Sequence, residues 1–166
     1  MSGLFQKGKA WGWAGLLLLA IPAATKGYTS GDYSYVVNWP EIYLPEYTGP
    51  FHYTITGYSG AGGSVTIPQS FNDAMNWVTK IGAYSFQNQQ TLRSVANSYG
   101  VESIEQYAFY NCGSLTTVTL PLYGALSSIG AFAFQGTGLR KVEISDFVEV
   151  IGQGAFSSCM SLTAIV

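Results

Sequence analysis

The sequence of 166 residues is short of charge, histidine and cysteine. Charged side chains make up only 10% of it, fewer than the 15% that are aromatic, and a disordered chain would show the opposite balance. No run of Lys or Arg is present to follow a phosphate backbone, and the net charge is -2, so we expect no nucleic-acid partner. Long helical patterns are also missing, because Gly, Thr, Ser and Tyr recur too often. What remains is one domain with a sizeable, β-rich core.

The scarcity of metal-binding and nucleophilic residues excludes further classes of protein. His52 is the only histidine and the two cysteines form no Cys-x-x-Cys pair, so we expect no metal site and no Ser-His-Asp or Cys-His site. Residues 57–64, GYSGAGGS, are glycine-rich, but a strand pattern follows them in place of the Gly-Lys-Ser/Thr and helix of a phosphate loop. We expect this segment to be a turn between two strands.

One long apolar run is present, at the N-terminus. Lys7 and Lys9 precede residues 10–24, AWGWAGLLLLAIPAA. A basic start, a short apolar stretch and small residues after it are typical of a secretory signal peptide. The run is shorter than the roughly 20 residues that span a bilayer, which favours a signal peptide over a transmembrane helix. An uncleaved anchor and a buried core segment are the alternatives. We therefore expect residues 1–27 to be a signal peptide or membrane anchor, and the protein to be secreted or at the cell surface.

A motif recurs four times in the second half of the chain. Its copies, called coils from here on, begin at Ile81, Ile104, Ile129 and Ile151, 22 to 25 residues apart. Three further slots repeat at fixed offsets, and they hold Phe86, Phe109, Phe134 and Phe156, then Leu92, Leu115, Leu139 and Leu162, then Val95, Val118, Val142 and Ile165. Such a period is the signature of a solenoid. One coil cannot bury its own apolar face, whereas stacked coils bury Ile on Ile, Phe on Phe and Leu on Leu.

The LxxVxL part of each coil, as in Leu115–Leu120, predicts one strand per coil, paired in parallel with the strand of the next coil. The pattern has three local departures. Gln89 stands where other coils have cysteine, Glu105 replaces the glycine that follows the isoleucine, and the third coil, with QGTGL, is one residue shorter between its Phe and its Leu. Upstream, residues 32–39 and 51–58 alternate in the manner of strands, with a proline-rich loop between them.

These residues resemble the BspA-like leucine-rich repeat, whose pattern runs roughly IGxxAFxxCxxLxxVxIPxxVxxIG. The resemblance covers residues 65–166, and YTITGYSGAGGSVTIP before them is similar to the segment that often leads into such repeats in secreted bacterial proteins. It implies a β-rich solenoid of about four coils in 65–166, incomplete at its C-terminus, behind a small N-terminal β cap in 28–64. The family's exported and surface members are often tied to adhesion.

The cysteines, Cys112 and Cys159, occupy the same slot two coils apart. Neighbouring coils stack about 5 Å apart, so a two-coil gap is too long for an undistorted disulfide. We expect small buried side chains, with a disulfide or a reactive thiol as the alternative.

Two sets of residues are candidates for binding. The first is the aromatic column Tyr84, Tyr107 and Phe132, three residues after each isoleucine, which ends at Gly154 in the fourth coil. It predicts either a stripe for a sugar chain or a peptide, or a partly buried stacking spine. The second is the outward face of the strands, where we single out Thr117, Thr119, Lys141 and Glu143.

We therefore expect a non-enzymatic secreted or cell-surface module for protein interaction or adhesion, which binds a protein or glycan ligand on a cell or matrix surface and uses no cofactor. The alternative is a structural or display segment of a larger cell-envelope protein, with no ligand of its own. An enzyme is disfavoured, since acidic residues such as Glu105 and Asp146 share no repeat slot that would let two carboxylates converge on one bond.

Overall fold

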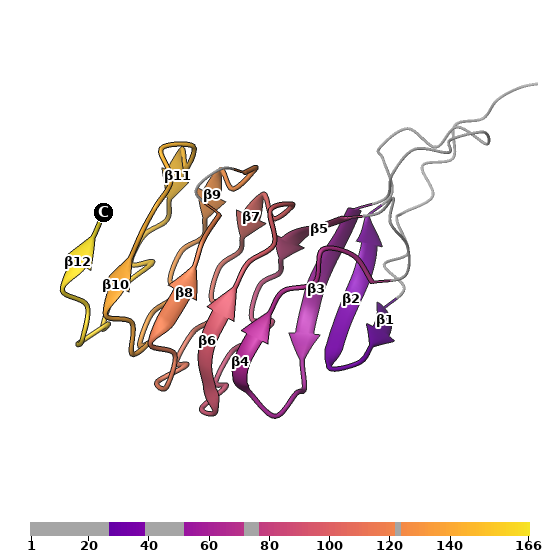
Figure 1. Cartoon of the computed structure of the whole chain (residues 1–166), viewed down its shortest axis with the longest axis horizontal. Coiled ribbons are helices and arrows are strands. Elements are labelled where there is room, and N and C mark those ends of the chain that lie inside the picture. Colours follow the sequence, from indigo (N-terminus) through magenta and orange to yellow (C-terminus); the bar gives the residue numbers. More distant parts are fainter. Residues whose placement is uncertain (1–26, 39–51, 72–76, 122–123) are drawn as a thin grey trace, which may run out of the picture.

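The computed structural model describes residues 27–38, 52–71, 77–121 and 124–166, and every regular element in them is a strand (Figure 1). The largest sheet has seven strands in the order β1 (Gly27–Ser30), β2 (Tyr33–Asn38), β3 (His52–Tyr58), β5 (Trp77–Ile81), β7 (Ser103–Ile104), β9 (Ser128–Ile129) and β11 (Val150–Ile151). A second sheet contains β4 (Gly63–Thr66), β6 (Leu92–Ala96) and β8 (Thr117–Thr119). A third pairs β10 (Lys141–Val142) with β12 (Ala164–Ile165).

The chain winds between these sheets as the repeat predicts. Each coil leaves the large sheet after its isoleucine, turns, crosses the opposite sheet in its LxxVxL segment and returns (Figure 1). Within the coils all pairings are parallel. The predicted β-solenoid of about four coils is therefore confirmed. The glycine-rich segment after Tyr58 is, as predicted, a turn between β3 and β4.

The structure adds a second strand to each coil, which the repeat pattern did not predict. These strands end on the repeated isoleucines, whose register runs Ile55, Ile81, Ile104, Ile129 and Ile151. Ile55 belongs to β3 and is fully buried. The N-terminal strands therefore continue the sheet of the solenoid: β1, β2 and β3 pair antiparallel, and β3 pairs in parallel with β5.

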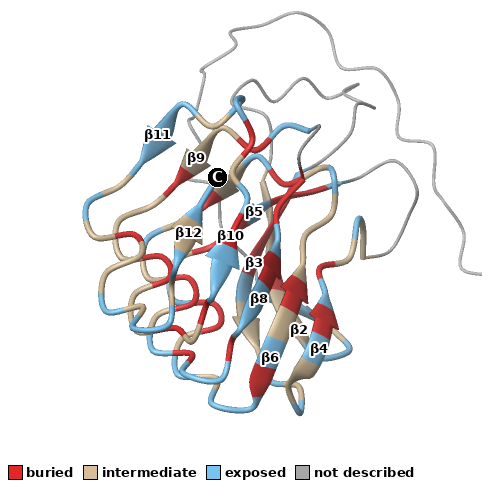
Figure 2. Ribbon diagram, turned by 60° about the vertical axis from the view of Figure 1, so that its left-hand side comes forward, coloured by how far each residue is buried: buried red, intermediate tan, exposed pale blue. Residues whose placement is uncertain are grey.

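A column of stacked rings forms the centre of the core. Phe86, Phe109 and Phe134 are completely buried, with ring centroids 4.9 and 5.2 Å apart. Tyr58 of β3 extends the column at one end and Phe156 at the other, at 5.0 and 5.3 Å. Burying one such ring contributes about 1.5–3 kcal/mol to stability, so this column is a main source of cohesion between coils. Burial declines in the last coil, where β11 is exposed along its length (Figure 2).

The cysteine slot has one task in all four coils: its side chain donates a hydrogen bond to a carbonyl beside the ring column. The donors and acceptors are Gln89 to Tyr58 (3.0 Å), Cys112 to Phe86 (3.0 Å), Thr137 to Phe134 (2.8 Å) and Cys159 to Phe134 (3.1 Å). Glutamine, cysteine and threonine share a side-chain hydrogen-bond donor, so the slot takes a donor and not a cysteine as such. Cys112 is buried as expected, Cys159 is half-buried in the last coil, and both are free thiols. Burial raises the pKa of the Cys112 thiol to about 11.

The shortened third coil coincides with a break in the sheet. In the described part of the chain, β8 is hydrogen-bonded to β6 but not to β10, although they belong to successive coils, and β10 pairs only with β12. The turns of the second and third coils stay joined, because the backbone N–H groups of Phe109 and Asn111 donate to the carbonyls of Ala133 and Gln135 at 2.8 Å. The missing residue thus opens the strand ladder without separating the coils.

Candidate binding surfaces

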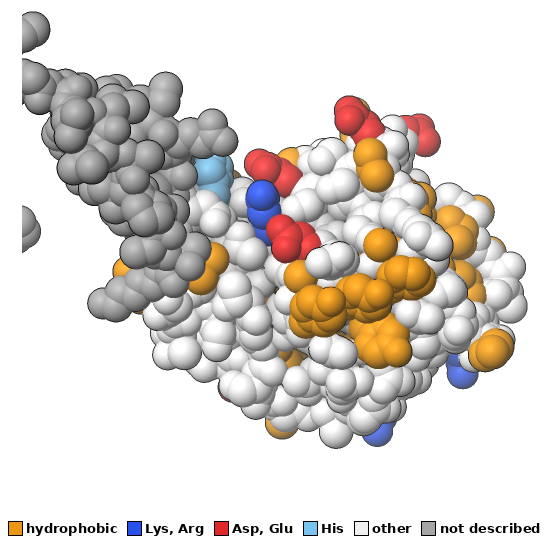
Figure 3. Space-filling view, turned by 180° about the vertical axis from the view of Figure 1, so that it is seen from behind, with side chains coloured by type: hydrophobic (Ala, Val, Ile, Leu, Met, Phe, Trp, Pro, Cys, Tyr) orange, Lys and Arg blue, Asp and Glu red, His pale blue; other side chains and the backbone are white. Residues whose placement is uncertain are grey.

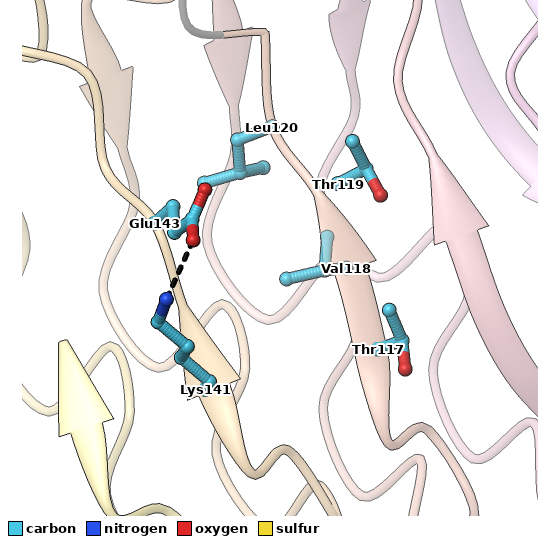
Figure 4. A pocket seen from close by; sticks show the side chains of 6 residues that line it. All are labelled: Thr117, Val118, Thr119, Leu120, Lys141 and Glu143. Carbon is cyan, nitrogen blue, oxygen red and sulfur yellow. Dashed lines mark hydrogen bonds and ion pairs between the residues drawn. The ribbon is translucent and has the colours of Figure 1, made fainter. Parts of the chain in front are cut away.

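An open hollow lies at the break between β8 and β10 (Figure 4). It has a volume of about 280 Å³ and is lined by Thr117, Val118, Thr119, Leu120, Lys141 and Glu143. The aliphatic side chains of Val118 and Leu120 are buried and form its apolar floor. The two threonines and the two charged residues are exposed and form its rim. The structure therefore brings together all four strand-face residues singled out from the sequence.

The charged rim residues pair with each other. Lys141 Nζ lies 2.6 Å from Glu143 Oε1, and the two side chains are 56% and 55% exposed (Figure 4). An ion pair this exposed contributes only about 0.2–1 kcal/mol, because water and salt screen it. Breaking this pair therefore costs little, and a charged group of a partner can pair with Lys141 or Glu143 instead.

Beyond the hollow, the outer face of β4, β6 and β8 carries two rows of small side chains. Strand register aligns Ser64, Ser94 and Thr117 in one row and Thr66, Ala96 and Thr119 in the other. None of the five hydroxyl groups bonds to another described residue. Alternation along a strand places these residues opposite the buried Val65, Val95 and Val118, as the sequence predicts. The face thus offers free hydrogen-bonding groups beside the hollow.

The predicted aromatic column lies on the other side of the molecule. The rings of Tyr84 and Tyr107 stack with centroids 5.1 Å apart, and those of Tyr107 and Phe132 at 5.2 Å. Tyr110 stands against Tyr107 at a 77° angle. These four residues are called the aromatic stripe. From behind, hydrophobic side chains gather in a row across the middle of the molecule (Figure 3). Tyr84 is 49% exposed, while Tyr107 and Phe132 are half-buried.

The backbone of this column is in an uncommon conformation. The φ angles of Tyr84, Tyr107 and Phe132 are 61°, 57° and 57°, and Gly154, the fourth member, has 63°. Left-handed backbone costs a residue with a side chain about 1–2 kcal/mol, and glycine nearly nothing. A second left-handed slot in each coil holds residues suited to this conformation in three coils, namely Asn88, Asn111 and Gly136, and Ser158 in the last.

The stacking in the column does not by itself offset this backbone cost. Each stacked aromatic pair contributes about 0.5–1.5 kcal/mol, and there are two pairs against three strained residues. Partial burial of the rings also stabilises this conformation, and this contribution is smallest for Tyr84, whose side chain is half exposed. Bulky residues held in left-handed backbone are a reason to look for function. Sequence reasoning missed the strain, although Gly154 in the same slot was a signal of it.

No cluster of metal ligands forms among the described residues. No three His, Cys, Asp or Glu side chains of this part gather as metal ligands would. His52 lies exposed at the start of β3. The described part has no helix of the length and apolarity needed to span a membrane. The apolar segment 10–24 lies outside the described residues.

Comparison with known families decides the affiliation of the chain. The model of the BspA type leucine rich repeat region matches residues 64–166, with six copies of its repeat. The chain belongs to this family. No curated protein matches the sequence.

Solved structures share the BspA-type fold. The pneumococcal vaccine antigen PcpA superposes with a TM-score of 0.70 at 17% identity, over 86% of this chain and 38% of that one. A leucine-rich repeat protein from Bacteroides capillosus gives 0.66 at 24% identity, over 84% and 96%. The T. pallidum leucine-rich repeat protein gives 0.57 at 22% identity, over 84% and 71%. The chain therefore spans well under half of PcpA and most of the other two. At these identities the likeness concerns the fold alone.

Proposed function

We propose that this BspA-type repeat protein is a non-enzymatic, secreted or cell-surface interaction module of adhesion type, which binds a protein through the hollow between β8 and β10. One observation carries the proposal: the only break in the strand ladder of the described coils forms a hollow with an apolar floor ringed by hydrogen-bonding side chains. Membership of the family and the description of PcpA as a vaccine antigen support a surface location.

The composition of the hollow suits a protein partner. Val118 and Leu120 offer apolar contact, and the exposed hydroxyls of Thr117 and Thr119 can each donate and accept a hydrogen bond. Lys141 and Glu143 present one positive and one negative charge at the rim, which fits a partner with an opposed pair of charges. The hydroxyl rows on β4 and β6 extend this contact area along the solenoid.

The test is a binding measurement on the full chain with a charge-swapped variant. The chain is screened by surface plasmon resonance against immobilised extracellular-matrix proteins, such as collagen and laminin. The double variant Lys141→Glu/Glu143→Lys keeps an ion pair in place but reverses its direction. We expect the affinity of this variant for the matrix protein that the native chain binds to be about tenfold lower, while its urea midpoint is unchanged.

The control is Glu149→Ala, an exposed residue in the link before β11, which should leave binding intact. Equal affinity of the charge-swapped variant and the native chain would contradict a role for the hollow. A chain that binds no protein in the screen would favour the alternative role, a structural or display segment of a larger envelope protein.

A further inference from the structure

We propose that the aromatic stripe is a second binding site, for a neutral polysaccharide, centred on the half-exposed ring of Tyr84. This site is separate from the hollow, and it goes beyond the protein-binding role proposed above. It rests on the strained backbone of the column, on the glutamines next to it in the chain and on the absence of cationic side chains in the turns that carry it.

The ring column is closed at one end and open at the other. A Cβ atom added to Gly154 would lie 2.5 Å from Cε1 of Phe132, so the Phe132 ring lies directly over this glycine. Phe132 therefore has Tyr107 on one side and the backbone of the fourth coil on the other. Tyr84 is stacked only on Tyr107 among the described residues, and it is the most exposed ring of the column. It is also the ring whose strained backbone gains least from packing.

Four glutamines stand within three residues of a column member in the chain, and none of their side-chain amides bonds to another described residue. Gln87 and Gln135 occupy the slot of Tyr110, whose ring stands against Tyr107. Gln106 and Gln153 directly precede Tyr107 and Gly154 in the chain, and their backbone carbonyls accept hydrogen bonds from the backbone N–H groups of Tyr84 and Phe132. These two glutamines are exposed and the first two half-buried. Each amide can both donate and accept, which matches the hydroxyl groups of a sugar.

The surface around the stripe carries little charge. The turn segments 82–88, 105–111, 130–136 and 152–158 contain no Asp, Lys or Arg, and their only Glu is Glu105. The neighbouring acid Glu105 is held at the margin, where its Oε2 accepts a hydrogen bond from the N–H of Ala83 at 3.1 Å. A negative group at the margin disfavours an acidic polymer, and the site offers no cation to bind one.

These properties together select the ligand class. A flat apolar ring with free amides beside it provides apolar contact and hydrogen bonds, without ion pairs, for a ligand with apolar faces and many hydroxyls. The same turn recurs in each coil, about 4.8 Å further along the axis, so the site is extended and suits a polymer better than a single sugar. A neutral polysaccharide has both features.

The experiment measures retention of the full chain in native gels that contain a soluble polysaccharide. The neutral probes are laminarin, xylan and glucomannan, and the acidic probes are alginate and hyaluronate. We expect retardation by at least one neutral probe and by neither acidic probe. Tyr84→Ala should weaken binding to that neutral probe about tenfold or more, Tyr84→Phe should keep most of it, and Gln106→Ala should weaken it by a smaller factor.

Two further variants keep the outcome interpretable. Tyr84→Asn places a residue suited to left-handed backbone at this position, so it tests loss of the ring in a chain that folds at least as well. The charge-swapped variant Lys141→Glu/Glu143→Lys should bind the polysaccharide like the native chain, and Tyr84→Ala should bind protein like the native chain. Failure at the stripe is thereby distinguished from failure at the hollow.

Three results would overturn the proposal. One is the absence of retardation by any neutral probe. A second is native-like binding by folded Tyr84→Asn. A third is binding confined to alginate and hyaluronate, or to immobilised peptides, with loss in Tyr84→Asn, which would assign the stripe to another class of ligand.

Discussion

The left-handed slot that holds the aromatic column can be probed at its glycine member. Gly154→Ala adds one methyl group at φ 63°, and the new Cβ would lie 2.5 and 2.7 Å from Cε1 and Cδ1 of Phe132. The backbone conformation costs alanine about 1–2 kcal/mol, from which the lower entropy of the unfolded alanine chain subtracts about 0.4–1. The Phe132 ring must also move away from its position 5.2 Å from Tyr107, which removes about 0.5–1.5 kcal/mol of stacking. We expect a total destabilisation of about 0.5–3 kcal/mol.

Two other glycines separate the backbone cost from the contact cost. Gly31 has φ 56° with no atom within 4 Å of an added Cβ, so Gly31→Ala should show the backbone cost alone, about 0–1.6 kcal/mol. Gly27 has neither a left-handed backbone nor a close neighbour, so Gly27→Ala should change stability by less than about 0.5 kcal/mol.

The measurement is urea unfolding followed by tyrosine and tryptophan fluorescence, with stability differences taken from the midpoint at constant slope. The double variant Gly154→Ala/Phe132→Ala removes the ring that the new methyl group meets, so its cost should be less than the sum of the two single variants. The reasoning is refuted if Gly154→Ala is no more destabilising than Gly31→Ala, or if the two single costs simply add. In that case the ring column would not depend on the glycine beneath it.

Three further predictions follow from the core and the N-terminus. Phe109→Ala should destabilise the protein by about 3–5 kcal/mol, because the Phe109 ring is fully buried between two others. Phe156→Ala should cost clearly less, because the last coil is partly exposed. Equal urea midpoints of the two variants would contradict this order. Burial raises the pKa of the Cys112 thiol from its ordinary 9.0 to about 11, so the thiol loses its proton first in the unfolded chain, and stability should fall as pH rises from about 9 to 11. Cys112→Thr, which keeps the hydrogen-bond donor, should make stability depend less on pH in this range. An unchanged dependence of stability on pH in this variant would rule the thiol out as its cause. Export should remove the segment before about residue 28, so mass spectrometry of secreted protein that finds an intact N-terminus would exclude a cleaved signal peptide.

The stacked columns could be predicted from the sequence because each one depends on a residue type that recurs at a fixed offset. Isoleucine, phenylalanine and leucine recur at the same places in each coil, and a coil that cannot bury them alone has to stack. The same periodicity places Thr117, Thr119, Lys141 and Glu143 on the outer face of the strands. The cysteine slot was predicted as apolar, and its task as a hydrogen-bond donor became clear only when Gln89 and Thr137 were seen to meet the same kind of carbonyl.

The sequence by itself determined the solenoid, its period, its buried columns and the residues available on two surfaces, because all of these follow from which side chains repeat. The tertiary structure decided what lies between repeats. Two-residue strands such as β7 and β9 are too short to leave an alternating pattern, so the ladder through the isoleucines was hidden. The one-residue deletion in the third coil was visible, but whether it would loop out, shift the register or open the ladder depended on how neighbouring coils hold each other. The left-handed backbone under the aromatic column is likewise imposed by the shape of the turn, and in the sequence only Gly154 of the fourth coil indicates it.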